Sequence, residues 1–260
     1  MRIAVGVEYD GSNFSGWQLQ KHGERTVQEE VEKALSKVAN HPVRVYCAGR
    51  TDTGVHATGQ VVHFETGAER DERAWVFGAN ANLPKDVAVL WAKPVPEAFH
   101  ARFSAQNRAY RYVIFTRHVR PTFLAYRVTW HHRELDVVRM AEAGKALIGE
   151  HDFSSYRAVA CQAKSPVRIL HKLEVSRQGP FIFIDLEANG FLHHMVRNIA
   201  GVLMAIGEGE QPIEWSREVL EARDRTLGGV TAQPYGLYLT EVGYPAEFGL
   251  PTLTHVPPVW

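Results

Sequence analysis

The order of hydrophobic periodicities over the first 95 residues constrains the fold more than any other feature. Residues 2–9 alternate like a strand, and apolar residues then recur at helical spacing behind a capping-box pattern formed by Thr26 and Glu29. The predicted elements are, in order, a strand at 2–9, a helix at 26–40, strands at 43–48 and 60–65, a helix at 71–80 and a strand at 87–95. This order, β-α-β-β-α-β, is that of a split unit whose two helices cover one face of an antiparallel sheet.

The second half of the chain roughly repeats this order with insertions. Pro94, Pro96 and the polar run at 104–107 indicate a boundary, so we expect one α+β half at 1–104 and another at 105–260. The expected elements are strands at 108–115 and 125–130, a helix at 136–148, a hairpin of strands at 167–177 and 181–187, helices at 191–206 and 212–224, and a strand at 237–244.

Composition excludes two classes of protein. The 260 residues are 45% hydrophobic, too many for a disordered chain, and 22% charged, too many for a membrane protein. No apolar run approaches the ~18 residues of a membrane span, and the chain begins with a strand-like pattern instead of a basic leader. We therefore expect a cytoplasmic protein without a membrane partner.

Charge is unevenly distributed although the net charge is +0. Residues 98–133 contain seven arginines and no acid, and residues 153–173 contain four Lys or Arg and no acid. A basic middle of this kind can bind phosphates, and an ordinary solvated surface is the alternative.

A glycine-bounded loop presents charged side chains between two strand-like segments. Arg50, Asp52 and His56 lie between the strands predicted at 43–48 and 60–65. Glycines permit positive φ or the close approach of a ligand, while Thr and Asp side chains hydrogen-bond their own backbone. From the residues alone, Asp52 is best explained as a turn residue.

The same loop, G-R-T-D-T-G-V-H-A at 49–57, resembles the signature of the tRNA pseudouridine synthase A family. Thr53 stands where Ala is more usual in that family. Four further stretches also resemble it: F-S-G-W-Q at 14–18, R-A-Y-R-Y at 108–112, F-L-H-H-M-V-R-N at 191–198 and G-L-Y-L at 236–239. In the second of these, Ala109 stands where the family usually has a basic residue.

The resemblance assigns roles that the residues alone do not reveal. It implies that Asp52 is the catalytic carboxylate, that Tyr110 and Leu237 lie in the active site and that Arg197 pairs with the catalytic Asp. Without it, Tyr110 and Leu237 are core residues and Arg197 belongs to a solvated helix face. The expected RNA contacts are Arg50, Tyr110, Phe14, Gln18 and Arg111, with Phe14 on a loop suited either to stacking on bases or to filling its own core.

By this resemblance the chain isomerises uridine to pseudouridine in the anticodon stem-loop of tRNA, at tRNA positions 38–40. The product is an isomer of the substrate, so no redox cofactor, metal or nucleoside donor is needed. The resemblance also implies a homodimer that holds tRNA across two subunits. The expected fold is α+β, with two ferredoxin-like, RRM-like β-α-β-β-α-β halves that form a continuous, mostly antiparallel sheet with a central active-site cleft.

The sequence leaves the chemistry of Asp52 open between attack on C1′, addition to C6 and removal of the 2′ proton. A non-catalytic RNA-binding module is one alternative, because residues 108–115 partly fit the aromatic spacing of an RNA-recognition strand. A metal-dependent phosphodiesterase is another, suggested by the pairs His131 and His132, and His193 and His194. Adjacent histidines on a helix point about 100° apart, which disfavours their chelating one ion.

Overall fold

The computed structural model describes residues 1–20 and 23–251, which divide into two compact units. The first unit contains Met1–Gln106 together with the described chain from Tyr238 on, and the second contains Asn107–Leu237. The boundary after residue 106 lies two residues from the predicted one. The prediction differs at the end of the chain, because it placed residues 238–251 in the second half; residues 252–260 of that half lie outside the described residues.

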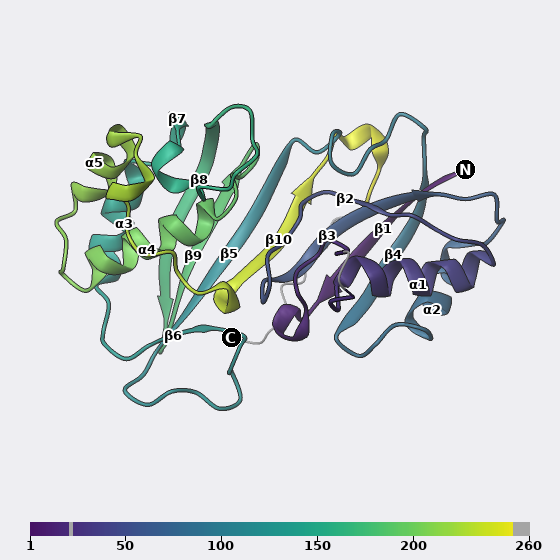
Figure 1. The fold of residues 1–260 in the computed structure, drawn as a ribbon, viewed down its shortest axis with the longest axis horizontal. Coiled ribbons are helices and arrows are strands. Elements are labelled where there is room, and N and C mark those ends of the chain that lie inside the picture. The colour runs from purple at the N-terminus through teal and green to yellow at the C-terminus, as the bar shows by residue number, and fades with distance from the viewer. Residues whose placement is uncertain (21–22, 252–260) are drawn as a thin grey trace. The chain divides into compact units, whose positions relative to one another are not determined.

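The first unit has the predicted β-α-β-β-α-β order, followed by a strand from the end of the chain (Figure 1). Its elements are β1 (Arg2–Tyr9), α1 (Val27–Ala39), β2 (Tyr46–Cys47), β3 (His56–Glu65), α2 (Glu72–Asn80), β4 (Val87–Val95) and β10 (Leu237–Gly243). The strands lie in the order β4-β1-β3-β10, with β2 beside β3. The β1–β3, β1–β4 and β2–β3 pairs are antiparallel, whereas β10 is parallel to β3.

Apolar faces of the helices and the sheet form the core of the first unit. Phe64 of β3 packs edge-on against Trp75 of α2, with ring centroids 5.1 Å apart, and both side chains are almost fully buried. Helix α1 begins where its capping pattern predicts, after Thr26, but the Thr26 hydroxyl is buried and makes no hydrogen bond with the described residues. The capping pattern therefore located the helix start correctly while the predicted side-chain cap does not form.

The second unit also combines β-strands with α-helices. Its elements are β5 (Asn107–Thr116), β6 (Thr129–His131), α3 (Val137–Lys145), β7 (Gly149–Asp152), β8 (Val167–Gln178), β9 (Phe181–Ala188), α4 (Met195–Gly207) and α5 (Trp215–Ala222). The strands lie in the order β5-β9-β8-β7, all antiparallel, with the short β6 parallel to β5. The predicted α+β class with a mostly antiparallel sheet is confirmed.

Three expectations for the second unit are wrong in detail. The strand expected at 125–130 is confined to Thr129–His131, and a short strand at 149–152 was not expected. The helix expected from residue 191 begins only at Met195. His194 has a φ of 61°, in the left-handed region, so a right-handed helix cannot run through this residue. Phe191 therefore precedes the helix instead of lying on its buried face. No helix within residues 1–20 and 23–251 has both the length and the hydropathy needed to cross a membrane.

A buried histidine makes the stability of the first unit depend on pH. His63 on β3 is 2% exposed, and its Nδ1 accepts a hydrogen bond of 3.1 Å from the Ala101 N–H. Burial, together with the charges of His100 and Arg2, lowers the pKa of His63 to about 4. The folded pKa lies below the ordinary value near ~6.5, so protonation favours the unfolded state.

We expect neutral His63 to leave the free energy of unfolding unchanged above pH ~6.5. As the pH falls from ~6.5 toward ~4, the free energy of unfolding should decrease by roughly 3 kcal/mol, because only the unfolded chain binds the proton. Urea unfolding at several pH values measures it. His63→Gln should flatten this acid-induced loss, and the exposed His171→Gln is the control. Equal acid sensitivity in the wild type and His63→Gln would contradict the prediction.

Candidate active site

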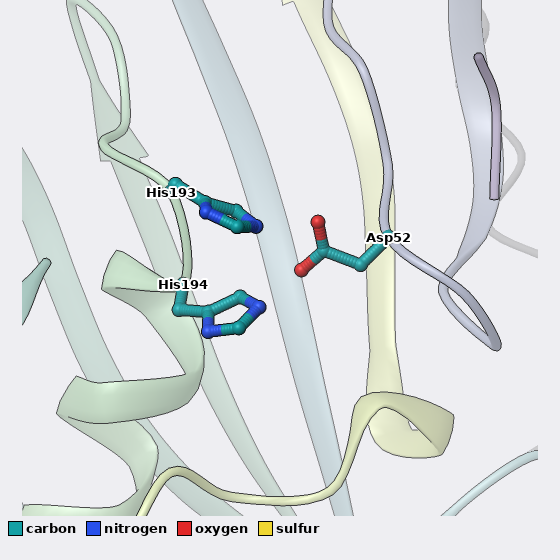
Figure 2. A group of neighbouring side chains, drawn as sticks. All are labelled: Asp52, His193 and His194. Carbon is teal, nitrogen blue, oxygen red and sulfur yellow. The ribbon is translucent and has the colours of Figure 1, made fainter. Parts of the chain in front are cut away.

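The loop that carries Asp52 is fixed at several points within the first unit. The Tyr9 hydroxyl lies 2.8 Å from Thr51 Oγ1, and the Thr51 carbonyl accepts a hydrogen bond of 3.0 Å from the Trp17 N–H. On the other side of the turn, Gln60 Nε2 donates to the Gly49 carbonyl at 2.6 Å. Asp52 itself is half-buried on this loop, between β2 and β3 (Figure 2). The carboxylate is thus presented by a backbone that neighbouring strands hold in place.

Gly16 supports the Asp52 loop from behind, and only glycine fits there. Its φ is 87°, and a Cβ at this position would lie 2.7 Å from the Thr51 carbonyl oxygen. We expect Gly16→Ala to displace the loop, to lower stability by about 1–3 kcal/mol and to reduce turnover at saturating substrate. Thermal unfolding and single-turnover kinetics measure the two effects.

Gly23 provides the matched control for Gly16. Its φ of 75° is also in the left-handed region, but a Cβ there would have nothing within 4 Å. Gly23→Ala therefore introduces similar backbone strain without a clash, and turnover should be retained. If both variants lost turnover equally, displacement of the Asp52 loop would not be the cause.

His56 is a buried residue whose contacts hold the first unit together. It begins β3 instead of lying on the predicted loop, and it is 1% exposed with its ring stacked 4.5 Å from that of Tyr238. Its Nδ1 accepts the Gly11 N–H at 3.0 Å. Asp10 Oδ1 lies 3.2 Å from the same nitrogen. Burial opposes the change, but the contacts with His56 and Ser12 hold the pKa of the Asp10 carboxyl below its usual range.

The expectation of an exposed stacking aromatic at Phe14 is wrong. Phe14 is 2% exposed, and the Arg25 guanidinium covers its ring at 4.0 Å from the centroid. The nearby Trp17 is also buried, so this loop fills its own core, which was the alternative weighed for it. Gln18 donates from Nε2 to Gln28 Oε1 at 2.9 Å, an arrangement that orders the start of α1.

Tyr110 lies on β5 in the second unit and is 9% exposed. Its ring meets Phe191 edge-on with centroids 4.9 Å apart. This contact fits the core-packing role expected for Tyr110 when the family resemblance is left aside. It also orients the ring. Arg111, the next residue, makes two hydrogen bonds to the Asp185 carboxylate on β9, at 2.7 and 2.9 Å. A guanidinium neutralised in this way is a weaker phosphate ligand than an exposed one, such as that of Arg50.

Arg197 and Leu237 are linked within the second unit by the chain segment 232–237. Arg197, in the first turn of α4, donates from Nε to the Ala232 carbonyl at 2.8 Å, and the Ala232 N–H donates back to the Arg197 carbonyl at 3.1 Å. Leu237 follows at the start of β10 and is 6% exposed. The helix that carries the expected catalytic Arg therefore also anchors the segment that ends at the expected active-site Leu.

Tyr112 and Thr129 complete this anchor and were missed by sequence reasoning. The Tyr112 hydroxyl donates to the Gln233 carbonyl at 2.8 Å and lies 2.5 Å from Thr129 Oγ1. Burial raises the pKa of Tyr112, although the Thr129 hydrogen bond and the positive charge of Arg197 oppose this shift. The spacing of Tyr110 and Tyr112 along one strand face was visible in the sequence, but their different partners were not.

His193 and His194 lie on the loop that leads into α4 (Figure 2), so the prediction that they belong to the helix is wrong. Their ring centroids are 4.0 Å apart and the rings are tilted by 45°. The argument that helical geometry separates these two side chains therefore does not apply to this pair.

Comparison with known proteins identifies the family. A family model described as tRNA pseudouridine synthase matches residues 5–104 and 143–245, which include Asp52, Arg197 and Leu237. The chain belongs to the tRNA pseudouridine synthase A family. Tyr110 lies between the two matched ranges, so its assignment still depends on the local motif.

Relatives in several bacteria match this family member along nearly its full length. A tRNA pseudouridine synthase A from Nitrosococcus oceani is 65% identical over 260 residues, covering 100% of both chains. Proteins of the same name from Pseudomonas aeruginosa and Aeromonas hydrophila are 62% and 58% identical, covering 96% and 100% of this chain and 88% and 96% of their own. The family resemblance inferred from the sequence motifs is confirmed.

Proposed function

We propose that the chain isomerises uridine to pseudouridine in the anticodon stem-loop of tRNA, with Asp52 as the nucleophile. Membership of the tRNA pseudouridine synthase family makes it an isomerase. The observation that carries the finer proposal is the family's signature motif at 49–57, whose Asp52 lies on a loop fixed by Thr51 and Gly49. A side chain held this way is pre-organised for attack on a bound substrate.

The reaction breaks the N1–C1′ bond of uridine, turns the uracil and joins C5 to C1′. The C5 proton is removed, and N1 gains one, so atoms balance without a co-substrate. Asp52 is the proposed nucleophile at the ribose, in the pattern of a carboxylate that attacks a sugar carbon. Addition to C6 and removal of the 2′ proton remain alternatives, which trapping and sequencing of a covalent adduct would distinguish. Leu237 is proposed to exclude water from the detached base.

Tyr110 is proposed to stack on the uracil and to accept the C5 proton. A phenol with an ordinary pKa near ~10 is a weak base, so its environment must assist it. We expect Tyr110→Phe to bind tRNA as the wild type does, because the ring remains, but to form pseudouridine about 10²-fold more slowly or worse. A rate equal to that of the wild type would remove the proton-transfer role and leave only stacking.

The target uridine must leave its stack to react, at a cost of a few kcal/mol that is lowest in loops and at stem ends. This agrees with the anticodon arm, whose loop and stem end offer such positions, as the proposed substrate region. Exposed Arg50 is the proposed phosphate contact nearest the nucleophile in sequence. A cytoplasmic homodimer belongs to the same proposal, and analytical ultracentrifugation tests the dimer.

The deciding experiment is incubation of the protein with unmodified tRNA transcripts, followed by carbodiimide modification and primer extension. Pseudouridine confined to the anticodon stem-loop is the expected result. Modification elsewhere in tRNA would preserve the activity but overturn the proposed region. Tight binding without modification would instead favour the non-catalytic RNA-binding module.

A further inference from the structure

The loop between β5 and β6, residues 117–128, follows the long strand β5 in the second unit (Figure 1). It carries exposed side chains that the reaction does not explain. It lies in the stretch between the two ranges that the family model matches. The loop contains no acid; its cationic residues are Arg117, Arg120 and Arg127, and His118 adds a further titratable ring. All four are exposed, so this loop presents positive charge to solvent.

Aromatic side chains stand out from the same loop. Phe123 is 94% exposed and Tyr126 is 57% exposed, whereas the aromatics of the loop at 14–17 are buried. A phenylalanine exposed to this extent gains nothing from the protein core. Exposed rings interspersed with arginines are the combination used to bind unpaired nucleotides, because bases stack on the rings while guanidinium groups contact phosphates.

The loop is held in a defined shape despite its exposure. The Arg117 guanidinium donates to the Val119 and Arg120 carbonyls, both at 2.7 Å, and Trp130 Nε1 donates to the Arg117 carbonyl at 2.7 Å. Tyr126 has a φ of 63°, a strained conformation for a bulky residue that costs about 1–3 kcal/mol and is found chiefly where function requires it. The rings are therefore presented by an ordered backbone.

The loop is also joined to the segment that carries Leu237. Tyr126 packs edge-on against Tyr235, with ring centroids 5.1 Å apart, two residues before Leu237. At the end of the loop, Thr129 lies beside the Tyr112 hydroxyl, which donates to Gln233. Within the second unit, a nucleotide bound by the loop would thus lie beside the residue proposed to cover the uracil.

We propose that the β5–β6 loop binds tRNA next to the target uridine, with Phe123 stacked on an unpaired base and Arg120 on a neighbouring phosphate. The inference rests on the proposed function and adds a substrate contact to it. The twelve successive residues of the loop contain arginines and no acid, so the loop is complementary in charge to phosphates. A polyanion therefore fits the loop better than a second copy of this chain, whose net charge is +0, does. Arg117 is a positioning residue, since its guanidinium is occupied by loop carbonyls.

Phe123→Ala and Phe123→Trp test the stacking. With an unmodified tRNA transcript in filter binding at moderate salt, Phe123→Ala should weaken affinity about tenfold, Phe123→Trp should retain it and Phe123→Leu should behave like Ala. The KM should rise while turnover of bound tRNA stays close to that of the wild type. Phe77→Ala is the matched control, because Phe77 is 63% exposed on α2, a helix with Glu72 in its first turn.

The outcomes separate this inference from the proposed function. If the wild type forms pseudouridine and Phe123→Ala binds and reacts like Phe77→Ala, the loop contact is overturned while the function stands. If the wild type binds tRNA without forming pseudouridine, the proposed function fails, and the binding arm alone decides the loop contact. If Phe123→Ala converts a dimer to monomers in sedimentation, or if Leu restores affinity as well as Trp does, the surface is a subunit interface and the proposal is wrong.

Arg120→Gln tests the phosphate contact independently. The slope of log affinity against log salt should decrease in magnitude by about 1, without a change in turnover of bound tRNA. Arg217→Gln on α5, an exposed arginine outside the loop, is the control and should leave the slope unchanged. An unchanged slope for Arg120→Gln would remove this residue from the proposed interface.

Discussion

Asp52→Asn should reduce pseudouridine formation by about 10⁴-fold or more while leaving tRNA affinity within about twofold of the wild type. The amide has the size of the carboxylate but is not a competent nucleophile or base. The backbone bonds of the loop, including Val55 N–H to the Asp52 carbonyl at 3.1 Å, do not involve the side chain. A 10⁴-fold loss corresponds to about 5.5 kcal/mol of transition-state stabilisation.

Single-turnover assays with excess enzyme measure this effect, and Thr53→Ala is the control within the same loop. Thr53 is exposed, and Ala is the residue more usual at this position in the family, so full activity is expected. Residual activity of Asp52→Asn above about a hundredth of the wild-type rate would mean that the carboxylate is not the nucleophile. An equal loss in Thr53→Ala would point to general disruption of the loop.

Arg197→Ala should reduce turnover by about 10³-fold with little loss of tRNA binding. A guanidinium keeps a catalytic carboxylate with which it pairs ionised and oriented, which is the role that the family resemblance implies for Arg197 toward Asp52. The substitution also removes the hydrogen bond from Nε to the Ala232 carbonyl, so a decrease in stability of about 1 kcal/mol should accompany it. Arg197→Lys retains the charge and should lose less activity than Ala does.

Arg139→Ala separates the two roles of Arg197. Arg139 also anchors backbone in the second unit, through hydrogen bonds to the Ile206 and Gln211 carbonyls at 3.1 and 2.9 Å. Its removal should lower stability by a similar amount but leave turnover unchanged. Equal losses of tRNA binding and turnover in Arg197→Ala would instead identify Arg197 as a phosphate-binding residue.

Elements with strong local signals were predicted closely. The strands at 2–9 and 87–95 coincide with β1 and β4, and the hairpin of β8 and β9 turns at Gly179, as expected. Local signals were misleading where the hydrophobic spacing predicted a helix or strand but the backbone is irregular. The apolar spacing from residue 191 suggested a helix, but the left-handed conformation of His194 delays it to Met195. Similarly, the pattern at 125–130 suggested a strand, but residues 125–128 belong to the loop before β6 and the strand is confined to Thr129–His131.

The sequence by itself determined the family and the α+β class and made Asp52 the candidate nucleophile, because short motifs and periodicities are local properties of the chain. Only the tertiary structure decided that β10 pairs with β3, that Phe14 is buried beneath Arg25 and that Arg111 is neutralised by Asp185. It also showed that Phe123 is exposed and that Arg197 anchors Ala232. These properties depend on partners far away in the sequence, and the free energy of burial and pairing is set by those partners, which no local pattern specifies.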